Sequence, residues 1–183
     1  MSRLTVIAGP TAVGKGTVVR WILDTHPEIQ VSVSATTREP RPGEEHGKDY
    51  YFVSAAEFER MQLESELLEF AVVHGAHNYG TPRKPVVEAL AAGKQMILEI
   101  DLQGARQIRQ SMPEANLIFI APPNWEELER RLAQRGTESE EQIAVRLATA
   151  REEMAAVGEF DYVVINTDVA ECGQQVLDLM QAS

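Results

Sequence analysis

A glycine-rich stretch near the start of the chain, GPTAVGKGT from Gly9 to Thr17, contains residue types that can hold the phosphates of a nucleotide. The phosphate-binding loop motif reads G-x-x-x-x-G-K-[ST]; its backbone N–H groups cradle phosphate oxygens and its lysine reaches the outer phosphates. Gly9, Gly14 and Lys15 fit this spacing, whereas Gly16 stands where the motif has a hydroxyl. Thr17 supplies a hydroxyl at the next position. The stretch therefore predicts a phosphate-binding loop, with a glycine-rich turn that imitates one as the alternative.

The surrounding sequence fits the strand–loop–helix context that such a loop needs. The apolar run LTVIA precedes the stretch, and KGTVVRWILDTH supplies the following helix. The first N–H groups of that helix and the positive end of its dipole favour anionic oxygens. We therefore interpret the stretch as the site of a phosphoryl donor, with expected contacts from Gly9, Pro10, Thr11, Ala12, Val13, Gly14, Lys15, Gly16 and Thr17.

Two acidic residues in the run MILEID, Glu99 and Asp101, lie near the end of a predicted buried strand. The carboxyl ends of parallel strands form the edge where α/β sheets bind ligands, and residues two apart in a strand share a face. We expect Glu99 to hold a metal ion through water, and Thr17 is a second candidate for contact with that metal. The alternative is that these acids cap a following helix.

The composition is that of a globular protein with one domain. The chain has 183 residues and a net charge of −11, which argues against a general nucleic-acid binder. No apolar run approaches the roughly 20 residues of a membrane-spanning helix, and the first residues lack the layout of a signal peptide. The single cysteine, Cys172, cannot form an internal disulfide. These features predict a cytoplasmic protein with no membrane or nucleic-acid partner.

Short apolar runs alternate with helix-like segments, which predicts an α/β fold with a buried parallel sheet. Strands are expected at LTVIAG, QMILEID, NLIFIA and DYVVIN, and helices near residues 15–25, 83–92, 104–111 and 168–181. Two segments, 32–82 and 124–146, interrupt the alternation. We interpret them as insertions in a single domain, 1–183, whose core is formed by residues 1–31, 83–123 and 147–183.

Helix starts within these insertions are marked by a capping residue followed three positions later by a glutamate. The pairs are Ser54 with Glu57, Asn124 with Glu127, and Thr137 with Glu140. After the last pair, apolar residues keep helical spacing, which predicts a buried stripe. The stripe consists of Ile143, Leu147, Ala150, Met154 and Val157.

The segment SATTREPRPGEEHGKDYYF, residues 34–52, strongly resembles the guanylate kinase family. The resemblance extends through the phosphate-binding loop and the runs at 67–82, 98–108, 130–147 and 160–166, in the order of that family. It implies a P-loop nucleoside monophosphate kinase fold, in which helices flank a parallel sheet, 32–82 binds GMP and 124–146 is a short lid. It also implies that ATP and GMP react to give ADP and GDP with Mg²⁺, and that dGMP is a second acceptor.

The same resemblance implies an acceptor site in the first insertion. Arg38 and Arg41 match the pair that clamps the phosphate of GMP, and Tyr50 and Tyr79 match the tyrosines that join them. Two guanidinium groups and two phenolic hydroxyls suit a dianionic phosphate. Glu44 is expected to orient Arg41. The residues that match the readers of the guanine ring are Ser34, Glu69, Thr81 and Asp101.

The resemblance further implies a lid that carries arginines to the donor phosphates and the moving phosphoryl group. Arg131, Arg135 and Arg146 match these lid arginines, and Asn166 matches a position near the adenine of ATP. We assign no metal to His74 and His77. The expected catalytic residues are Lys15, Arg38, Arg131, Arg135 and Arg146.

Two alternative functions remain, one of a different class and one a kinase of the same fold. A non-catalytic interaction module of the same fold typically loses the donor loop or the lid arginines, and both are present here. A kinase of the same fold that acts on another small phosphate would need the phosphate clamp but not the four guanine readers. We expect the protein to be a monomer or a homodimer.

Overall fold

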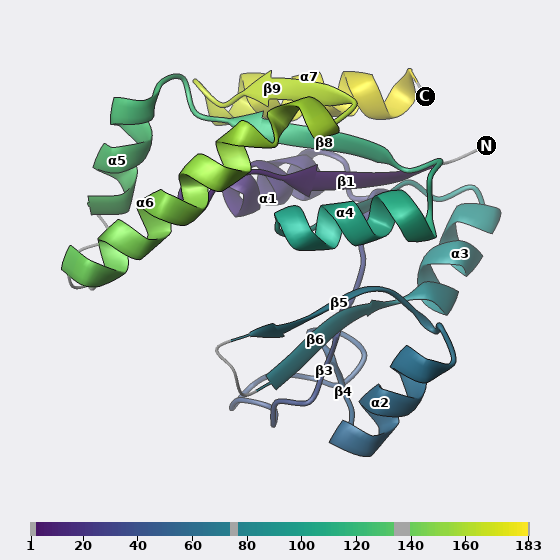
Figure 1. The fold of residues 1–183 in the computed structure, drawn as a ribbon. Coiled ribbons are helices and arrows are strands. Elements are labelled where there is room, and N and C mark those ends of the chain that lie inside the picture. The colour runs from purple at the N-terminus through teal and green to yellow at the C-terminus, as the bar shows by residue number, and fades with distance from the viewer. Residues whose placement is uncertain (1–2, 74–76, 134–139, 183) are drawn as a thin grey trace.

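A parallel five-stranded sheet forms the centre of the molecule (Figure 1). The computed structural model describes residues 3–73, 77–133 and 140–182. The strand order is β2-β7-β1-β8-β9, and every pairing between neighbours is parallel. The strands are β1 (Leu4–Ala8), β2 (Gln30–Val31), β7 (Met96–Glu99), β8 (Asn116–Ala121) and β9 (Tyr162–Ile165).

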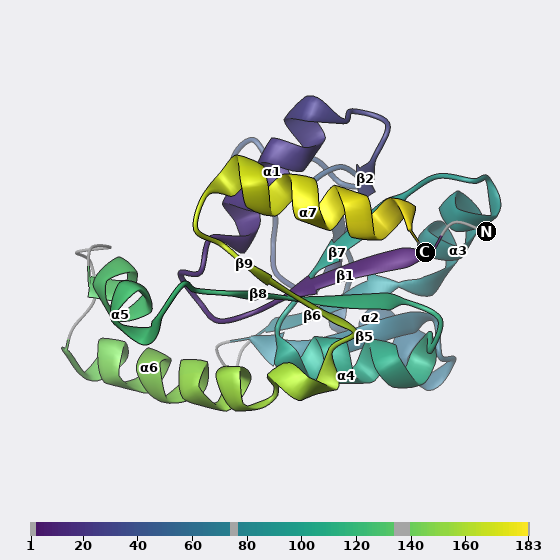
Figure 2. The same ribbon diagram turned by 90° about the horizontal axis from the view of Figure 1, so that it is seen from above.

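Helices cover both faces of this sheet (Figure 2). On one face lie α1 (Lys15–Thr25) and α7 (Val169–Gln181), and on the other lie α3 (Arg83–Ala91) and α4 (Leu102–Ser111). Consecutive residues of β1, Val6 and Ile7, are fully buried and belong to the hydrophobic clusters on opposite faces. A strand buried on both faces reads as a continuous apolar run, and the predicted α/β fold with its parallel sheet is confirmed.

A second, four-stranded sheet forms a separate lobe below α4 (Figure 1). Its order is β4-β3-β6-β5, and β5 and β6 form an antiparallel hairpin. Helix α2 (Ala55–Leu63) packs on it through Phe58 and Met61. Ser54 caps this helix as predicted, because its side chain accepts from the Glu57 N–H. The strands are β3 (Ala35–Thr36), β4 (Tyr51–Phe52), β5 (Leu67–Val73) and β6 (His77–Pro82).

Two helices, α5 (Trp125–Ala133) and α6 (Glu140–Ala155), follow β8. Asn124 caps α5 as predicted, since its Oδ1 accepts the Glu127 N–H at 2.8 Å, whereas Thr137 lies outside the described residues. The predicted stripe on α6 is only partly right. Ala150 is buried, and Ile143, Leu147 and Met154 are half-buried. Val157 lies beyond the end of α6, in the 3₁₀ turn η1 (Val157–Glu159).

Gly9 lies at the end of β1, where the chain passes close to β8. Its φ is +145°, and a Cβ built on it would lie 2.2 Å from the Ile120 carbonyl oxygen. Only glycine tolerates this backbone conformation and this close approach.

No helix in the described part of the chain has the length and apolar character to cross a membrane.

Because of the close approach of Gly9 to Ile120, Gly9→Ala is expected to lower the free energy of unfolding by about 3 kcal/mol or more. Both the strained backbone and the collision with a carbonyl oxygen contribute to this loss. Urea unfolding followed by circular dichroism measures the change. Gly93→Ala is the matched control, since Gly93 has a φ of +78° but no atom within 4 Å of a built Cβ. It is expected to cost only about 1 kcal/mol of backbone strain. Equal losses in the two variants would contradict the close approach at Gly9.

Candidate active site

The predicted donor loop connects β1 to α1 at the carboxyl edge of the sheet. Gly14 is the N-cap of α1 with a left-handed φ of 98°, and a Cβ there would lie 2.7 Å from Nδ2 of Asn166. Glycine is the residue that tolerates both the conformation and the close approach. The loop borders a pocket of about 580 Å³ lined by Pro10, Thr11, Ala12, Gly14, Lys15, Gly16, Thr17, Arg20 and Glu99.

Three side chains donate hydrogen bonds to backbone carbonyl oxygens of this loop, namely Lys15, Asn166 and Arg131. The Lys15 ammonium donates to the Gly9 and Pro10 carbonyl oxygens at 2.5 and 3.3 Å. The carbonyl of Val13 accepts from Asn166 Nδ2 at 2.8 Å and from Arg131 Nη1 at 3.0 Å. Asn166, predicted near the adenine of ATP, and Arg131, predicted on the lid, are thus both placed against the donor loop.

Arg131 is held in this position by an ion pair within α5. Its Nε lies 2.8 Å from Glu127, whose carboxylate also binds Arg130 at 2.6 Å. The two guanidinium groups, Arg130 first, lower the pKa of Glu127 to about 2. Arg146 lies half-buried on α6, and Arg135 falls outside the described residues.

Glu99 ends β7 beside the loop, as its position in the sequence predicts. A Cβ on Gly16 would lie 3.7 Å from both of its carboxylate oxygens. Burial raises the pKa of Glu99, and the charge of Lys15 opposes that rise. Mg²⁺ in kinases is usually held by one or two carboxylates together with substrate phosphates, so Glu99 and the Thr17 hydroxyl fit the ion. No group of three or more His, Cys, Asp or Glu converges as a metal site in the described residues.

Asp101 does not share a strand face with Glu99, contrary to the expectation from spacing. Strand β7 ends at Glu99, and Asp101 is the N-cap of α4, where its Oδ1 accepts the Gly104 N–H at 2.8 Å. Asp101 therefore caps α4 through Oδ1, as the alternative expected, while its predicted contact with guanine stays a prediction. The reason is local: the free N–H groups of the first turn of α4 need an acceptor.

Three of the four residues predicted to clamp a phosphate, namely Arg38, Tyr50 and Tyr79, lie together beside the second sheet. The Arg38 guanidinium donates through Nε to the Tyr79 hydroxyl at 3.1 Å and through Nη2 to Glu44 at 2.8 Å. The Tyr50 ring lies 5.4 Å from Arg38 and packs edge-on against Tyr79. Arg38 is thus fixed by an ion pair, a phenol and an aromatic face, which orients its fork before any anion arrives.

Glu44 contacts Arg41 through the backbone rather than through the guanidinium. Its Oε2 accepts the Arg41 N–H at 2.7 Å, while its Oε1 pairs with Arg38. The Arg38 guanidinium, followed by the Arg41 N–H, lowers the pKa of Glu44. The expectation that Glu44 orients Arg41 therefore needs correction, because the side chain that it orients is Arg38. The side chain of Arg41 is exposed.

Glu44→Gln is expected to raise the KM for GMP about tenfold, because one charge-assisted hydrogen bond to Arg38 or Arg41 is lost. Initial-rate kinetics with GMP varied at saturating ATP measures the change. The matched control is Glu45→Gln, since Glu45 is exposed and pairs only with Lys48 at 3.4 Å among the ion pairs of the described residues. A KM that is the same in both variants would remove Glu44 from the acceptor site.

A buried carboxylate, Glu69 on β5, lies at the junction of the second sheet and α4. It is 7% exposed, and its Oε1 accepts the hydroxyl of fully buried Thr81 at 2.6 Å. Burial raises the pKa of Glu69; the Thr81 hydrogen bond opposes the rise and the charge of Asp101 adds to it. The structure therefore brings the predicted guanine readers Glu69 and Thr81 into contact. Asp101 lies close enough to affect Glu69, and Ser34 precedes β3.

Helix α4 holds the strand on both sides of Glu69. The Gln107 side chain accepts the Phe70 N–H at 3.0 Å and donates to the Phe70 carbonyl at 2.9 Å, as a neighbouring strand would. The Ser111 hydroxyl donates to the Leu68 carbonyl at 2.7 Å. Gly104 leaves room for the carboxylate, because a Cβ there would lie 3.3 Å from Glu69 Oε2.

Three residues of this site were not predicted from the sequence: Arg20, Gly104 and Gln107. Arg20 follows the donor loop by one helical turn, so that helical spacing from Gly16 or Thr17 could have indicated it. Gly104 interrupts a helix, which is a signal for close packing. Gln107 carries no such signal, because its partner Phe70 lies far away in the sequence.

Comparison with known proteins agrees with this geometry. A family model described as "Guanylate kinase" matches residues 1–183. The chain is 58% identical over 177 residues to the guanylate kinase of Leifsonia xyli subsp. xyli, which is 97% of this chain and 70% of that protein. It is 57% identical over 180 residues to the guanylate kinase of Thermobifida fusca, 98% of this chain and 91% of that protein.

A solved structure supports the same family. The crystal structure of guanylate kinase from Anaplasma phagocytophilum superposes with a TM-score of 0.74 at 35% identity, over 99% of this chain and 85% of that one. The family match covers the whole chain, and it therefore includes both the donor loop and the buried carboxylate Glu69. The chain thus belongs to the guanylate kinase family, the ATP:GMP phosphotransferases.

Proposed function

We propose that this chain transfers the γ-phosphoryl group of ATP to GMP and, as a second acceptor, to dGMP, with the residues described above in the predicted roles. The observation that carries the proposal is the buried Glu69–Thr81 pair beside the phosphate clamp. Guanine has N–H donors at N1 and N2 that a carboxylate accepts, and adenine has neither. An adenine in this place would leave a buried carboxylate unpaired.

The donor loop is proposed to hold the ATP phosphates with its backbone N–H groups and Lys15. Thr17 and, through water, Glu99 would hold Mg²⁺, which when bound neutralises phosphate charge. Arg38, Arg41, Tyr50 and Tyr79 would hold the GMP phosphate still for in-line attack. Ser34 and Asp101 would complete the guanine contacts, and Glu44 would orient Arg38.

The lid arginines are proposed to act on the transferring group. Arg131 already lies against the donor loop through Val13. Arg135 and Arg146 are proposed to join it when residues 124–146 close over ATP, adding positive charge around the phosphoryl group in flight. The phosphoryl group passes directly from ATP to GMP. Closure of the lid excludes water from the site and so protects ATP from hydrolysis.

ADP release from ATP and Mg²⁺, with GMP, dGMP, AMP, CMP or UMP offered in turn, tests the proposal. We expect release with GMP and dGMP alone. Release with AMP at a comparable rate would exclude the guanine-reading role of Glu69. A protein that binds GMP without releasing ADP would be an interaction module, and release with none of the five would favour another phosphate acceptor.

The setting of this reaction is also a proposal. ATP and GMP are cytoplasmic metabolites, and we propose that the protein works there as a monomer or a homodimer. Sedimentation velocity with and without nucleotides distinguishes the two assemblies.

A further inference from the structure

Strand β5 contains a β-bulge at the position of Glu69. The register of β5 on β6 shifts by one residue between Leu67 and Phe70. Two residues, Leu68 and Glu69, therefore stand opposite Thr81 alone, which is the arrangement of a bulge. A bulge bends its strand and changes the direction of the side chains that it carries. The direction of the Glu69 carboxylate thus depends on how this bulge is held.

The bulge is held by side chains of α4. Strand β5 lies at an edge of its sheet, so the backbone groups on its outer side need partners from elsewhere. The Gln107 amide accepts the Phe70 N–H at 3.0 Å and donates to the Phe70 carbonyl at 2.9 Å. On the other side of Glu69, the Ser111 hydroxyl donates to the Leu68 carbonyl at 2.7 Å. Gln107 therefore pairs with β5 in the place of a neighbouring strand.

The carboxylate of Glu69 lies against the same helix. A Cβ built on Gly104 of α4 would lie 3.3 Å from Glu69 Oε2, while Glu69 Oε1 accepts the Thr81 hydroxyl at 2.6 Å. Gln107 follows Gly104 by three residues, and residues three apart in a helix share a face. One face of α4 thus borders the carboxylate and also holds the backbone from which that carboxylate projects.

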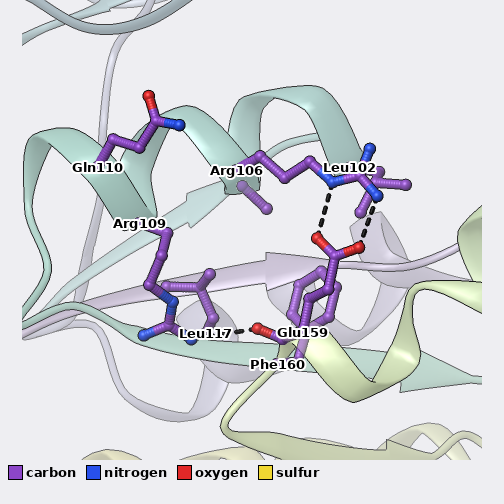
Figure 3. Close-up of a pocket in the computed structure, with 8 residues that line it drawn as sticks. Leu102, Arg106, Arg109, Gln110, Leu117, Glu159 and Phe160 are labelled. Carbon is purple, nitrogen blue, oxygen red and sulfur yellow. Dashed lines mark hydrogen bonds and ion pairs between the residues drawn. The ribbon is translucent and has the colours of Figure 1, made fainter.

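Helix α4 is itself fixed to the core, so it can serve as a rigid support. Its residues Ala105 and Ile108 are buried in the hydrophobic cluster that also contains residues of β1 and β7. The Arg106 guanidinium donates through Nε and Nη2 to the Glu159 carboxylate of η1 at 2.7 and 2.5 Å (Figure 3). Gln110 is exposed and lines the same pocket of about 220 Å³ as this ion pair.

We propose that Gln107 is a positioning residue for guanine recognition: its amide fixes the bulge of β5 and thereby aims the Glu69 carboxylate at the N–H groups of the base. Gln107 acts through Glu69 and does not touch the nucleotide. Ser111 supports the bulge from its other side. The proposal rests on the proposed function in one respect, namely that Glu69 reads the guanine ring.

Gln107→Met tests this role, because methionine keeps the length of the side chain but cannot make the two hydrogen bonds to Phe70. We expect kcat/KM for GMP to fall about tenfold, since the carboxylate loses its aim. The KM for ATP is expected to stay within about twofold of the wild type. Inosine monophosphate lacks the 2-amino group of GMP and offers the carboxylate only one N–H, so its kcat/KM is expected to fall less. The ratio of the two kcat/KM values is therefore expected to decrease by about threefold or more.

Initial rates of ADP release, with GMP, inosine monophosphate and ATP varied in turn, are the measurement. Gln110→Met is the matched control on the same helix and is expected to leave the kcat/KM of both acceptors unchanged. Ser111→Ala removes the hydrogen bond to Leu68 and is expected to lower the ratio in the same direction as Gln107→Met. Thermal unfolding of each variant checks that it is folded at the assay temperature, and Ser111→Ala provides the same test if Gln107→Met is not.

A double-mutant cycle separates positioning from general support of the fold. When Gln107→Met is introduced into Glu69→Gln, we expect it to change kcat/KM for GMP by less than about threefold, because no carboxylate is left to aim. A residue that only stabilises the second sheet would cause the same loss in both backgrounds.

Two results overturn the role of Gln107 alone, provided that Glu69→Gln impairs the use of GMP. One is a kcat/KM for GMP in Gln107→Met equal to that in Gln110→Met. The other is an undiminished loss from Gln107→Met in the Glu69→Gln background. A Glu69→Gln variant that keeps the wild-type kcat/KM for GMP would instead refute the guanine-reading role of Glu69, and the role of Gln107 with it.

Discussion

Lys15→Met is expected to reduce ADP formation by roughly 10³-fold or more while the fold remains intact. Methionine keeps an unbranched apolar stem like that of lysine, but it ends one atom short of the ammonium and has no charge. In the structure the ammonium is held by the Gly9 and Pro10 carbonyls and lies within electrostatic reach of Glu99 and Glu153. A cation at the mouth of the donor loop stabilises charge that moves onto the leaving phosphate during transfer, which explains the size of the expected loss.

A coupled assay of ADP release at saturating ATP and GMP measures this loss, and thermal unfolding checks the fold. Lys94→Met is the matched control, because Lys94 is exposed in the turn before β7. Turnover in Lys15→Met within tenfold of the control would move the donor site away from this loop. A large drop in unfolding temperature would instead assign the effect to folding.

The fold could be predicted where its signals are local. The β1–loop–α1 unit follows from an apolar run, a glycine at each sharp turn and a helix that begins at Lys15. Strands β1, β7 and β8 are largely buried runs, and their apolar sequences predict them directly. Strand β9 was also predicted from its apolar run, but the expectation that it is buried was wrong, because it lies at the edge of the sheet and only Val164 of its four residues is buried. The short strands β2, β3 and β4 have two residues each, and none has a periodicity that a sequence can reveal.

The site could be predicted only where a local sequence motif marks its residues. Asp101 was ambiguous, because a carboxylate just after a strand can serve as a ligand group, as a helix cap or as both, and only the position where β7 ends shows that it caps α4. The Glu44 pair with Arg38 depends on how the loop between β3 and β4 folds back.

Glu69→Gln is expected to lower kcat/KM for GMP by roughly 10²-fold or more, with little change in the KM for ATP. The carboxylate is buried and receives one hydrogen bond from Thr81, so the remaining acceptor capacity is available to guanine. An amide presents a donor where the guanine N–H groups need acceptors, and sites that read hydrogen-bonding groups discriminate by factors of up to roughly 10⁴. Initial rates with GMP and with ATP varied separately measure the two effects.

Two further variants show whether the carboxylate itself is responsible. Thr81→Val removes the hydroxyl that donates a hydrogen bond to Glu69. We expect this variant to lower kcat/KM for GMP as well, because the carboxylate loses the contact that orients it. Glu66→Gln changes a half-buried carboxylate that pairs with Arg60 and is expected to leave the kinetic constants for both substrates unchanged. Because Gln is nearly isosteric with Glu, the buried site keeps its packing, and a selective loss for GMP reports on recognition rather than on folding. Equal losses for ATP and GMP would place guanine recognition elsewhere in the second sheet.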